Sequence, residues 1–133
     1  QEYISGDEYS VMMAANKAGR LCAVVPVRIH QKKGITIHGE TDLNPTVIDY
    51  CQQLHYKFRP SGLYNIQLKL KEDQNVFPFE INPRISTTTC LSIAGGVDPI
   101  AIYLNDEKSQ DQQNCKNGIT LRRFWRNQLG GAI

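Results

Sequence analysis

The sequence predicts an α+β fold in which a largely antiparallel sheet packs against helices. Three observations support this prediction: several segments alternate apolar and polar residues, two of them form a hairpin, and capped segments with helical spacing lie between the strands. The expected order of elements is β-β-α-β-β-α-α-β. A length of 133 residues suits a single domain.

Two N-terminal strands are expected at residues 8–15 and 21–29. The turn-like segment NKAGR, which contains Gly19, separates them. After Gly34, residues 35–37 allow either a further short strand or an irregular connection.

The clearest helix begins after Asn44, a favourable N-cap, and has Pro45 at its first helical position. Pro60, followed by Ser and Gly, ends it. Apolar residues follow at helical spacing along one side of this helix: Val47, Cys51, Leu54 and Phe58.

The strongest hairpin joins residues 62–70 to residues 76–82 through the polar loop KEDQN. Alternation gives the first strand one apolar face, made of Tyr64, Ile66, Leu68 and Leu70. It gives the second strand a core face made of Phe77, Phe79 and Ile81. Each strand therefore has one apolar face for helices and one polar face left free.

Two short helices and a last strand complete the expected fold. Residues 86–94 form a helix that a Gly-Gly pair ends. Asp98, a cap followed by proline, opens a second helix over residues 100–107. The last strand is expected at residues 119–125.

The composition argues against several classes of partner. Fifteen basic and thirteen acidic residues give a net charge of +2, without the basic patch of a dedicated nucleic-acid surface. The segment LRRFWRNQ interleaves arginines with Phe124 and Trp125, but an edge strand whose aromatics cover the core explains it as well. No stretch approaches the roughly 20 apolar residues that cross a bilayer. Neither a nucleic acid nor a membrane is therefore expected as a partner.

The cysteines show no metal-binding or redox pattern. They are scattered and form no C-x-x-C pair: Cys22, Cys51, Cys90 and Cys115. Buried free thiols are the expectation, with a disulfide or zinc framework as the alternative. A reducing, cytoplasmic setting follows from that expectation.

Polar side chains gather on the free face of the hairpin. Glu80 and Asn82 lie about 6.5–7 Å apart on one face of their strand, because side chains alternate along a strand. If Gln67 of the partner strand faces them, a carboxylate and two amide oxygens converge, and Mg²⁺ and Mn²⁺ prefer such ligands. Arg84 follows after a stiff proline and can reach phosphate oxygens. The alternative is a strand that ends at an ordinary turn.

At this point the sequence resembles a known family. GLYNIQLKL followed by FEINPRIS is similar to the C-terminal half of the nucleotide-binding domain of ATP-grasp enzymes, and most of all to members that resemble the large subunit of carbamoyl-phosphate synthase. The resemblance implies that Gln67, Glu80 and Asn82 bind the Mg²⁺ or Mn²⁺ ions of the bound ATP. It implies a catalytic role for Arg84 at the phosphate or acyl-phosphate oxygens.

The opening segment QEYISGDEYSV is similar to the hinge of the same family. The resemblance implies adenine contacts through the backbone of Glu2, Tyr3 and Ile4, and a ribose contact from Glu8. Together with SIAGGVDPI it covers roughly residues 1–104. Because the chain starts at the hinge and without Met, we expect residues 1–133 to be a partial domain, the C-terminal lobe, whose N-terminal lobe and lid lie elsewhere in a longer protein.

The family implies a ligase that uses ATP. Such an enzyme activates a carboxylate as an acyl phosphate, which an amine or a similar nucleophile then attacks. The expected partners are ATP, small carboxylate and amine substrates, and the missing lobe, and the fragment alone is expected to be inactive. Two alternatives remain: bicarbonate activation of the carbamoyl-phosphate-synthase or biotin-carboxylase type, and a non-catalytic binding module that keeps the sheet.

Overall fold

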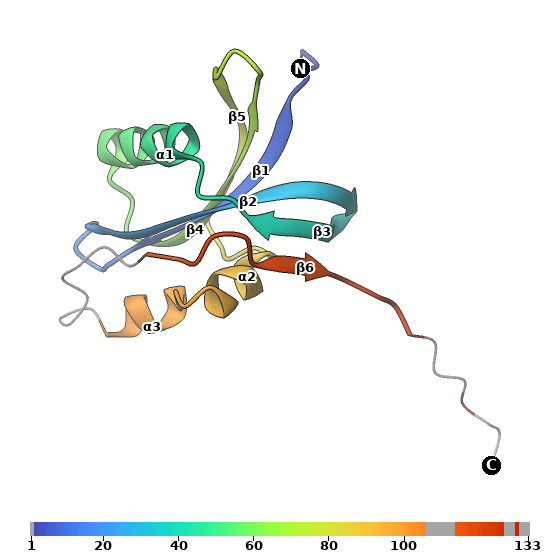
Figure 1. The fold of residues 1–133 in the computed structure, drawn as a ribbon. Helices are drawn as coiled ribbons and strands as arrows, with labels where there is room; N and C mark the ends of the chain where they lie inside the picture. The colour runs from blue at the N-terminus through green and yellow to red at the C-terminus, as the bar shows by residue number, and fades with distance from the viewer. Residues whose placement is uncertain (1, 106–113, 127–129, 131–133) are drawn as a thin grey trace.

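In the computed structural model, which describes residues 2–105, 114–126 and 130, six strands form one sheet (Figure 1). In chain order the strands are β1 (Asp7–Ala15), β2 (Leu21–Lys33), β3 (Ile35–Thr41), β4 (Gly62–Leu70), β5 (Val76–Asn82) and β6 (Thr120–Arg122). Their order across the sheet is β5-β4-β1-β2-β3-β6, and every neighbouring pair is antiparallel. The predicted fold class is confirmed.

Helices cover both faces of this sheet (Figure 1). Helix α1 (Pro45–Phe58) lies on one face, which we call the α1 face. Helices α2 (Thr89–Ala94) and α3 (Pro99–Leu104) lie on the other, the α2–α3 face. The two faces differ in their cover: α1 spans much of its face, whereas α2 and α3 cover only part of theirs.

The sheet separates two hydrophobic cores, since its central strands bury side chains on both sides. Alternate residues of β1 go to opposite faces. Val11 and Met13 pack with Cys51 of α1. Met12 packs with Ile102 of α3 in the second core. Full burial of such side chains stabilises the fold by about 1.5–3 kcal/mol each.

Helix α1 forms where its sequence signals predict. The Asn44 side chain accepts hydrogen bonds from the backbone N–H groups of Thr46 and Val47, which closes the first turn. Arg59 ends the helix in the left-handed conformation, with φ of 47°. The Asn44 cap contributes about 0.5–2 kcal/mol, judged by what its replacement with Ala costs in other helices.

Some element bounds differ from the prediction. The segment after Gly34 is a full strand, and β2 runs on to Lys33. Helix α2 begins at Thr89, because the Ser86 side chain accepts a hydrogen bond from the Thr88 N–H and holds residues 86–88 in a turn. Helix α3 ends at Leu104, and residues 106 and 107 of the expected helix lie outside the described residues.

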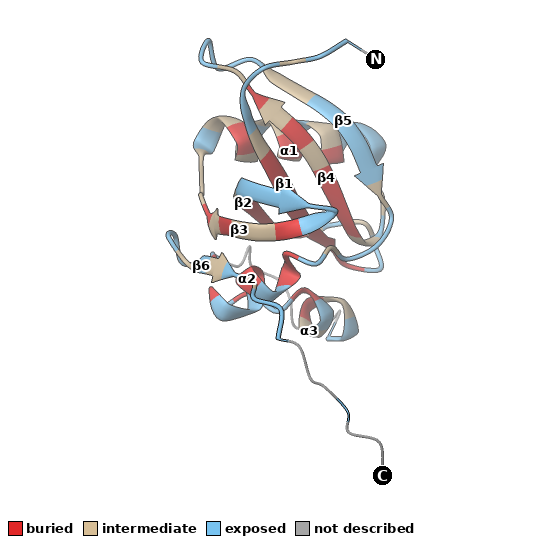
Figure 2. Cartoon of the chain, turned by 90° about the vertical axis from the view of Figure 1, so that its right-hand side faces the viewer, coloured by how far each residue is buried: buried red, intermediate tan, exposed pale blue. Residues whose placement is uncertain are grey.

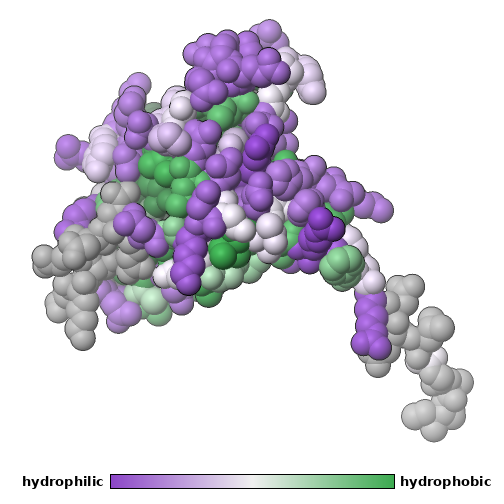
Figure 3. Space-filling view, viewed as in Figure 1, coloured by the Kyte–Doolittle hydropathy of each residue, from purple (hydrophilic) through white to green (hydrophobic). Residues whose placement is uncertain are grey.

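The C-terminal strand is also shorter than expected. β6 ends at Arg122, so Phe124 and Trp125 follow the sheet rather than cover its core. They are 86% and 66% exposed, which corrects the expectation that these aromatics help to bury the core. Hydrophobic side chains reach the surface elsewhere as well, and Figure 3 shows green areas among the hydrophilic ones.

A β-bulge in β5 overturns part of the predicted hairpin. Gln67 pairs with Glu80 but Lys69 pairs with Phe77, so Phe79 is an extra residue without a partner in β4. Phe77 therefore shares the face of Lys69 instead of the core face. Ile81 keeps the α1 face beside Ile66, but it is 52% exposed. The core side of β5 is much less buried than its alternation predicted.

The cysteines are free thiols among the residues that the structure describes. Three of them are buried (Cys22, Cys51 and Cys115), and Cys90 is exposed. Burial raises the pKa of the Cys51 thiol to about 12. The expectation that the thiols are free is confirmed for all four. The expectation that they are buried is wrong for Cys90. No helix in the described part of the chain is long and apolar enough to span a bilayer.

Candidate functional site

Part of the α2–α3 face has no helix over it. Helices α2 and α3 lie toward one end of this face, whereas β5 and the start of β1 are exposed at the other end (Figure 2). The exposed end carries charged and amide side chains from four strands: Glu8, Lys32, Gln67, Lys69 and Glu80. We call this group the open face.

The open face brings two of the expected metal ligands directly opposite one another. Gln67 of β4 pairs with Glu80 of β5, and directly opposed residues on antiparallel strands have Cα atoms about 4.5–5.5 Å apart. Asn82 is paired with Asn65, one step along the same face. The condition that the sequence left open, the register between these strands, is therefore fulfilled.

Two lysines contact side-chain oxygens of Glu8 and Gln67. Lys32 Nζ lies 2.9 Å from Glu8 Oε1 and 3.3 Å from Gln67 Oε1. Lys69 Nζ lies 3.5 Å from Glu8 Oε2. Exposed ion pairs of this kind stabilise a fold by at most about 1 kcal/mol. The ammonium groups show that Glu8 and Gln67 present their oxygens to one shared space, where a cation is favourable.

The turn after β5 positions Asn82 and Arg84. The backbone N–H of Arg84 donates to the carbonyl of Asn82 over 2.8 Å, and its guanidinium donates to the Ile85 carbonyl over 3.2 Å. Further on, Arg123 donates from Nη2 to the Thr87 carbonyl over 2.5 Å and so ties this loop to the chain after β6. Arg84 is left exposed at the border of the open face.

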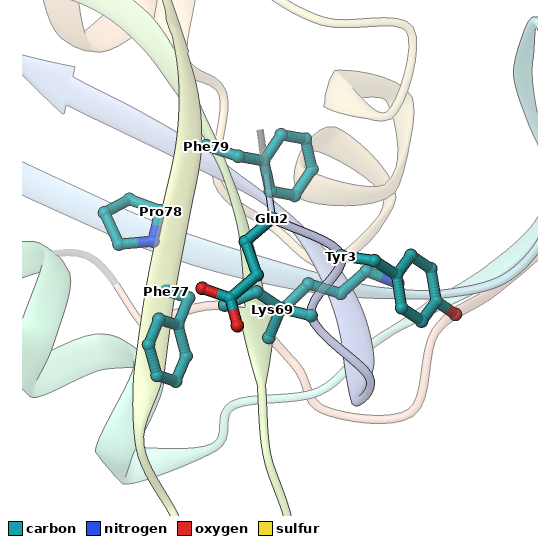
Figure 4. Close-up of a pocket in the computed structure, with 7 residues that line it drawn as sticks. Glu2, Tyr3, Lys69, Phe77, Pro78 and Phe79 are labelled. Atoms are coloured by element: carbon teal, nitrogen blue, oxygen red, sulfur yellow. The ribbon is translucent and has the colours of Figure 1, made fainter.

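An apolar pocket of about 320 Å³ adjoins the open face. Its lining comes from the N-terminal segment and the β4–β5 hairpin: Glu2, Tyr3, Ile4, Lys69, Phe77, Pro78 and Phe79. Figure 4 shows the Glu2 side chain extended toward the Phe77 ring, with the Tyr3 ring turned outward. Tyr3 is 88% exposed, in agreement with the outward turn of its ring. The structure thus places the three expected adenine-contact residues together beside two aromatic rings.

Sequence reasoning missed the aromatic side of this pocket. It assigned Phe77 and Phe79 to the core, because it carried a strict alternation through β5. Pro78 was the signal, since proline within a strand marks an edge or a bulge, where the alternation changes phase. It also missed Lys32, because the predicted second strand stopped at residue 29.

The expected metal ligands on and beside the open face fit a hard divalent cation with some of its ligands supplied from elsewhere. Gln67, Glu80 and Asn82 offer one carboxylate and two amide oxygens, and Mg²⁺ commonly takes one or two carboxylates with substrate phosphates and water. Among the described residues, no cluster of three or more His, Cys, Asp or Glu side chains could hold a metal ion. In this part of the chain, therefore, no metal centre made only of those four residue types is an alternative to the site at Gln67, Glu80 and Asn82.

Comparison with solved structures identifies the fold. The phosphoribosylaminoimidazole carboxylase ATPase subunit from Aquifex aeolicus matches with a TM-score of 0.65 and 16% identity over 80% of this chain and 36% of its own. The N5-carboxyaminoimidazole synthetase from Staphylococcus aureus complexed with ADP matches with 0.66 and 10% identity over 86% and 32%. An L-amino acid ligase from Bacillus licheniformis matches with 0.59 and 16% identity over 80% and 30%.

The chain spans about a third of the length of each of these structures. Among curated proteins, none is similar enough to the sequence to count as a match. A family model described as "ATP-grasp in the biosynthetic pathway with Ter operon" matches residues 1–125. This match covers more than half of the chain, and the chain belongs to this ATP-grasp family.

Proposed function

We propose that the chain is the ATP- and magnesium-binding lobe of a longer ligase, which activates a carboxylate as an acyl phosphate for attack by an amine or a similar nucleophile. One observation carries the proposal: Gln67 and Glu80 are opposed on an uncovered part of the sheet, next to an apolar pocket lined by two phenylalanines. Oxygen atoms that suit a cation and a pocket that suits a flat apolar ring lie side by side, which supports the binding of MgATP.

In this proposal each part of the site binds a different part of the nucleotide. Gln67, Glu80 and Asn82 hold the metal ion, which when bound offsets negative charge on the phosphates. Arg84, exposed on the adjoining turn, binds and stabilises the phosphoryl group as it is transferred, since its planar guanidinium suits phosphate oxygens. The protein groups act by position and charge, which is the main requirement of phosphoryl transfer.

In this proposal the adenosine of the nucleotide binds in the pocket and at its border. The backbone of Glu2, Tyr3 and Ile4 faces the base edge, while Phe77 supplies an apolar surface for the ring. Glu8 contacts the ribose after release from Lys32, whose ammonium it now holds. Lys69 contacts Glu8 and also lines the pocket, so it links the ribose end to the base end.

The substrates and the second lobe lie beyond this chain in the proposal. This chain covers only 36% and 32% of two solved structures that share the fold, and one of them was determined with ADP. We propose that a further lobe of the same protein closes over the nucleotide and supplies the lid. The narrower likeness to carbamoyl-phosphate synthases, with bicarbonate as the carboxylate, stays a prediction.

Calorimetry with MgATP on the polypeptide that carries this chain tests the proposal. The Glu80→Gln variant keeps the size of the side chain but removes its charge, and we expect it to lose metal-dependent ATP binding and turnover. Glu72→Gln, a like change at an exposed acid of the β4–β5 loop, serves as the control and should leave both unchanged. Retained turnover in Glu80→Gln would contradict the metal assignment. No metal-dependent heat in the unmodified protein would favour a non-catalytic module instead.

A further inference from the structure

Asn65 is a buried amide next to the proposed metal ligands, and no role has yet been assigned to it. It is 1% exposed and lies on β4, two residues before Gln67 and directly opposite Asn82 of β5. Buried polar side chains in folded proteins almost always have hydrogen-bond partners for each polar atom. The hydrogen bonds of Asn65 therefore show which way its amide points and what it still lacks.

The orientation of the Asn65 amide is fixed by two acceptors. Its Nδ2 donates to Ser10 Oγ over 2.9 Å and to the Val11 carbonyl over 3.0 Å. A carbonyl oxygen only accepts, so the atom beside Val11 must be the nitrogen, and both of its hydrogens are used. Ser10 is held in turn by Thr88, with 3.2 Å between their hydroxyl oxygens. The remaining atom, Asn65 Oδ1, is thus an acceptor with a set direction.

Two complementary atoms remain without partners at this register position. Among the described residues, Asn65 Oδ1 is a buried acceptor without a hydrogen bond, and Asn82 Nδ2 is a buried donor without one. They belong to residues that face each other across the β4–β5 ladder. One hydrogen bond between them, or one bridging water, satisfies both atoms.

We propose that Asn65 is a positioning residue: Asn65 Oδ1 accepts from Asn82 Nδ2, directly or through one water, and so turns Asn82 Oδ1 toward the metal ion. An amide can bind a cation through its oxygen but not through its NH₂ group, so the orientation decides whether Asn82 is a ligand. Groups behind a metal ligand commonly fix it in this way. This inference rests on the proposed metal role of Asn82.

A double-mutant cycle on the polypeptide that carries this chain tests the inference. Electron paramagnetic resonance measures the binding of Mn²⁺ in the presence of a non-hydrolysable ATP analogue. Asn65→Leu is close in size and removes the acceptor, and we expect it to weaken Mn²⁺ binding about tenfold. An Asp at position 82 has two equivalent oxygens and no NH₂ group to orient. In the Asn82→Asp background, Asn65→Leu should therefore change Mn²⁺ binding by less than about threefold.

Ser10→Ala is the matched control, because it disturbs the same buried network but leaves Asn65 Oδ1 in place. It should alter Mn²⁺ binding by less than about twofold, since the Val11 carbonyl still orients the amide. An equal loss from Asn65→Leu in both backgrounds would mean that Asn65 acts on stability alone, and would overturn the inference. If Glu80→Gln weakens Mn²⁺ binding but Asn65→Leu leaves it unchanged, the inference is also overturned. The proposed function is unaffected by that result.

Two further outcomes are decisive. If Glu80→Gln leaves Mn²⁺ binding unchanged, the proposed function fails, and this inference fails with it. If Asn65→Leu does not fold, proton exchange at the Asn82 side-chain amide of the unmodified protein is measured instead by nuclear magnetic resonance. It should be at least about tenfold slower than at Asn75, which is exposed. Equal rates would overturn the inference.

Discussion

The buried contact between His55 and Tyr64 predicts a specific double-mutant result. His55 Nε2 lies 3.0 Å from the Gly19 carbonyl, which only accepts, so Nε2 carries the proton. With the proton on Nε2, Nδ1 accepts, and the Tyr64 hydroxyl donates to it over 2.8 Å. The two side chains are 2% and 7% exposed, and burial raises the pKa of Tyr64, so the hydroxyl stays protonated as a donor.

The expected magnitudes follow from the groups that each change leaves unpaired. Tyr64→Phe leaves His55 Nδ1 buried without a donor, which costs about 1–3 kcal/mol of unfolding free energy. His55→Leu leaves both the Tyr64 hydroxyl and the Gly19 carbonyl without a partner, and costs about 2–4 kcal/mol. The double variant leaves only the carbonyl unpaired. Its loss should therefore fall short of the sum by about 1–2 kcal/mol.

Urea unfolding at neutral pH, followed by far-ultraviolet circular dichroism, measures all four proteins. The two single losses would be additive within about 0.5 kcal/mol if the side chains did not interact. Additivity would refute both the assigned tautomer and the hydrogen bond. Tyr64→Phe with no loss at all would refute them as well. Since Tyr64 lies on β4, a confirmed coupling would show that α1 and the turn at Gly19 hold the strand that carries Gln67.

Three further predictions concern the site and its surroundings. Phe77→Ser should weaken binding of a fluorescent ATP analogue about tenfold, because an aromatic surface for a base is worth about 1–3 kcal/mol, whereas Phe58→Ser on the α1 helix should not. Burial raises the pKa of Cys51 from 9.0 to about 12, so stability from this group is full below pH 9 and is lost as the pH rises toward 12. Urea midpoints of Cys51→Ala should therefore fall less steeply over that range, and an unchanged slope would contradict the buried thiol. Lys32→Met removes the ammonium that lies beside Gln67 Oε1, and in the absence of nucleotide it should strengthen Mn²⁺ binding a few-fold. Weaker Mn²⁺ binding would instead mean that the site needs Lys32.

Sequence patterns predicted the parts of the fold that depend on local signals. The bounds of α1 follow from the Asn44 cap and the Pro45 that starts the helix, and those of β4 and β5 from their composition. The order of strands across the sheet depends on pairings between distant segments. Those pairings leave no local trace, so β1 between β2 and β4 could not be read from the chain.

The candidate site could be predicted only in part, because it also depends on pairings between distant segments. The residue types of Gln67, Glu80 and Asn82 suggested metal ligands, and the register places the first two opposite each other. Their assigned roles stay predictions. Lys32 enters the group from β2, a strand that is two positions away from β4 in the sheet, and only the folded arrangement shows this contact. Asn65 alternates with Tyr64 and Ile66, so its strand face is the one predicted to be polar and free; the sequence does not show that Ser10 and Thr88 cover it.

The extra residue in β5 has a consequence for how this strand can change in length. In a regular strand, loss of one residue turns every later side chain to the opposite face. Loss of Phe79 would instead leave Phe77 paired with Lys69 and Glu80 paired with Gln67 in an uninterrupted ladder. Related chains one residue shorter at this point can therefore keep the same carboxylate and amide on the same face. Sequence alignments of β5 should accordingly allow a gap at position 79, between the aromatic half of the strand and its acidic half.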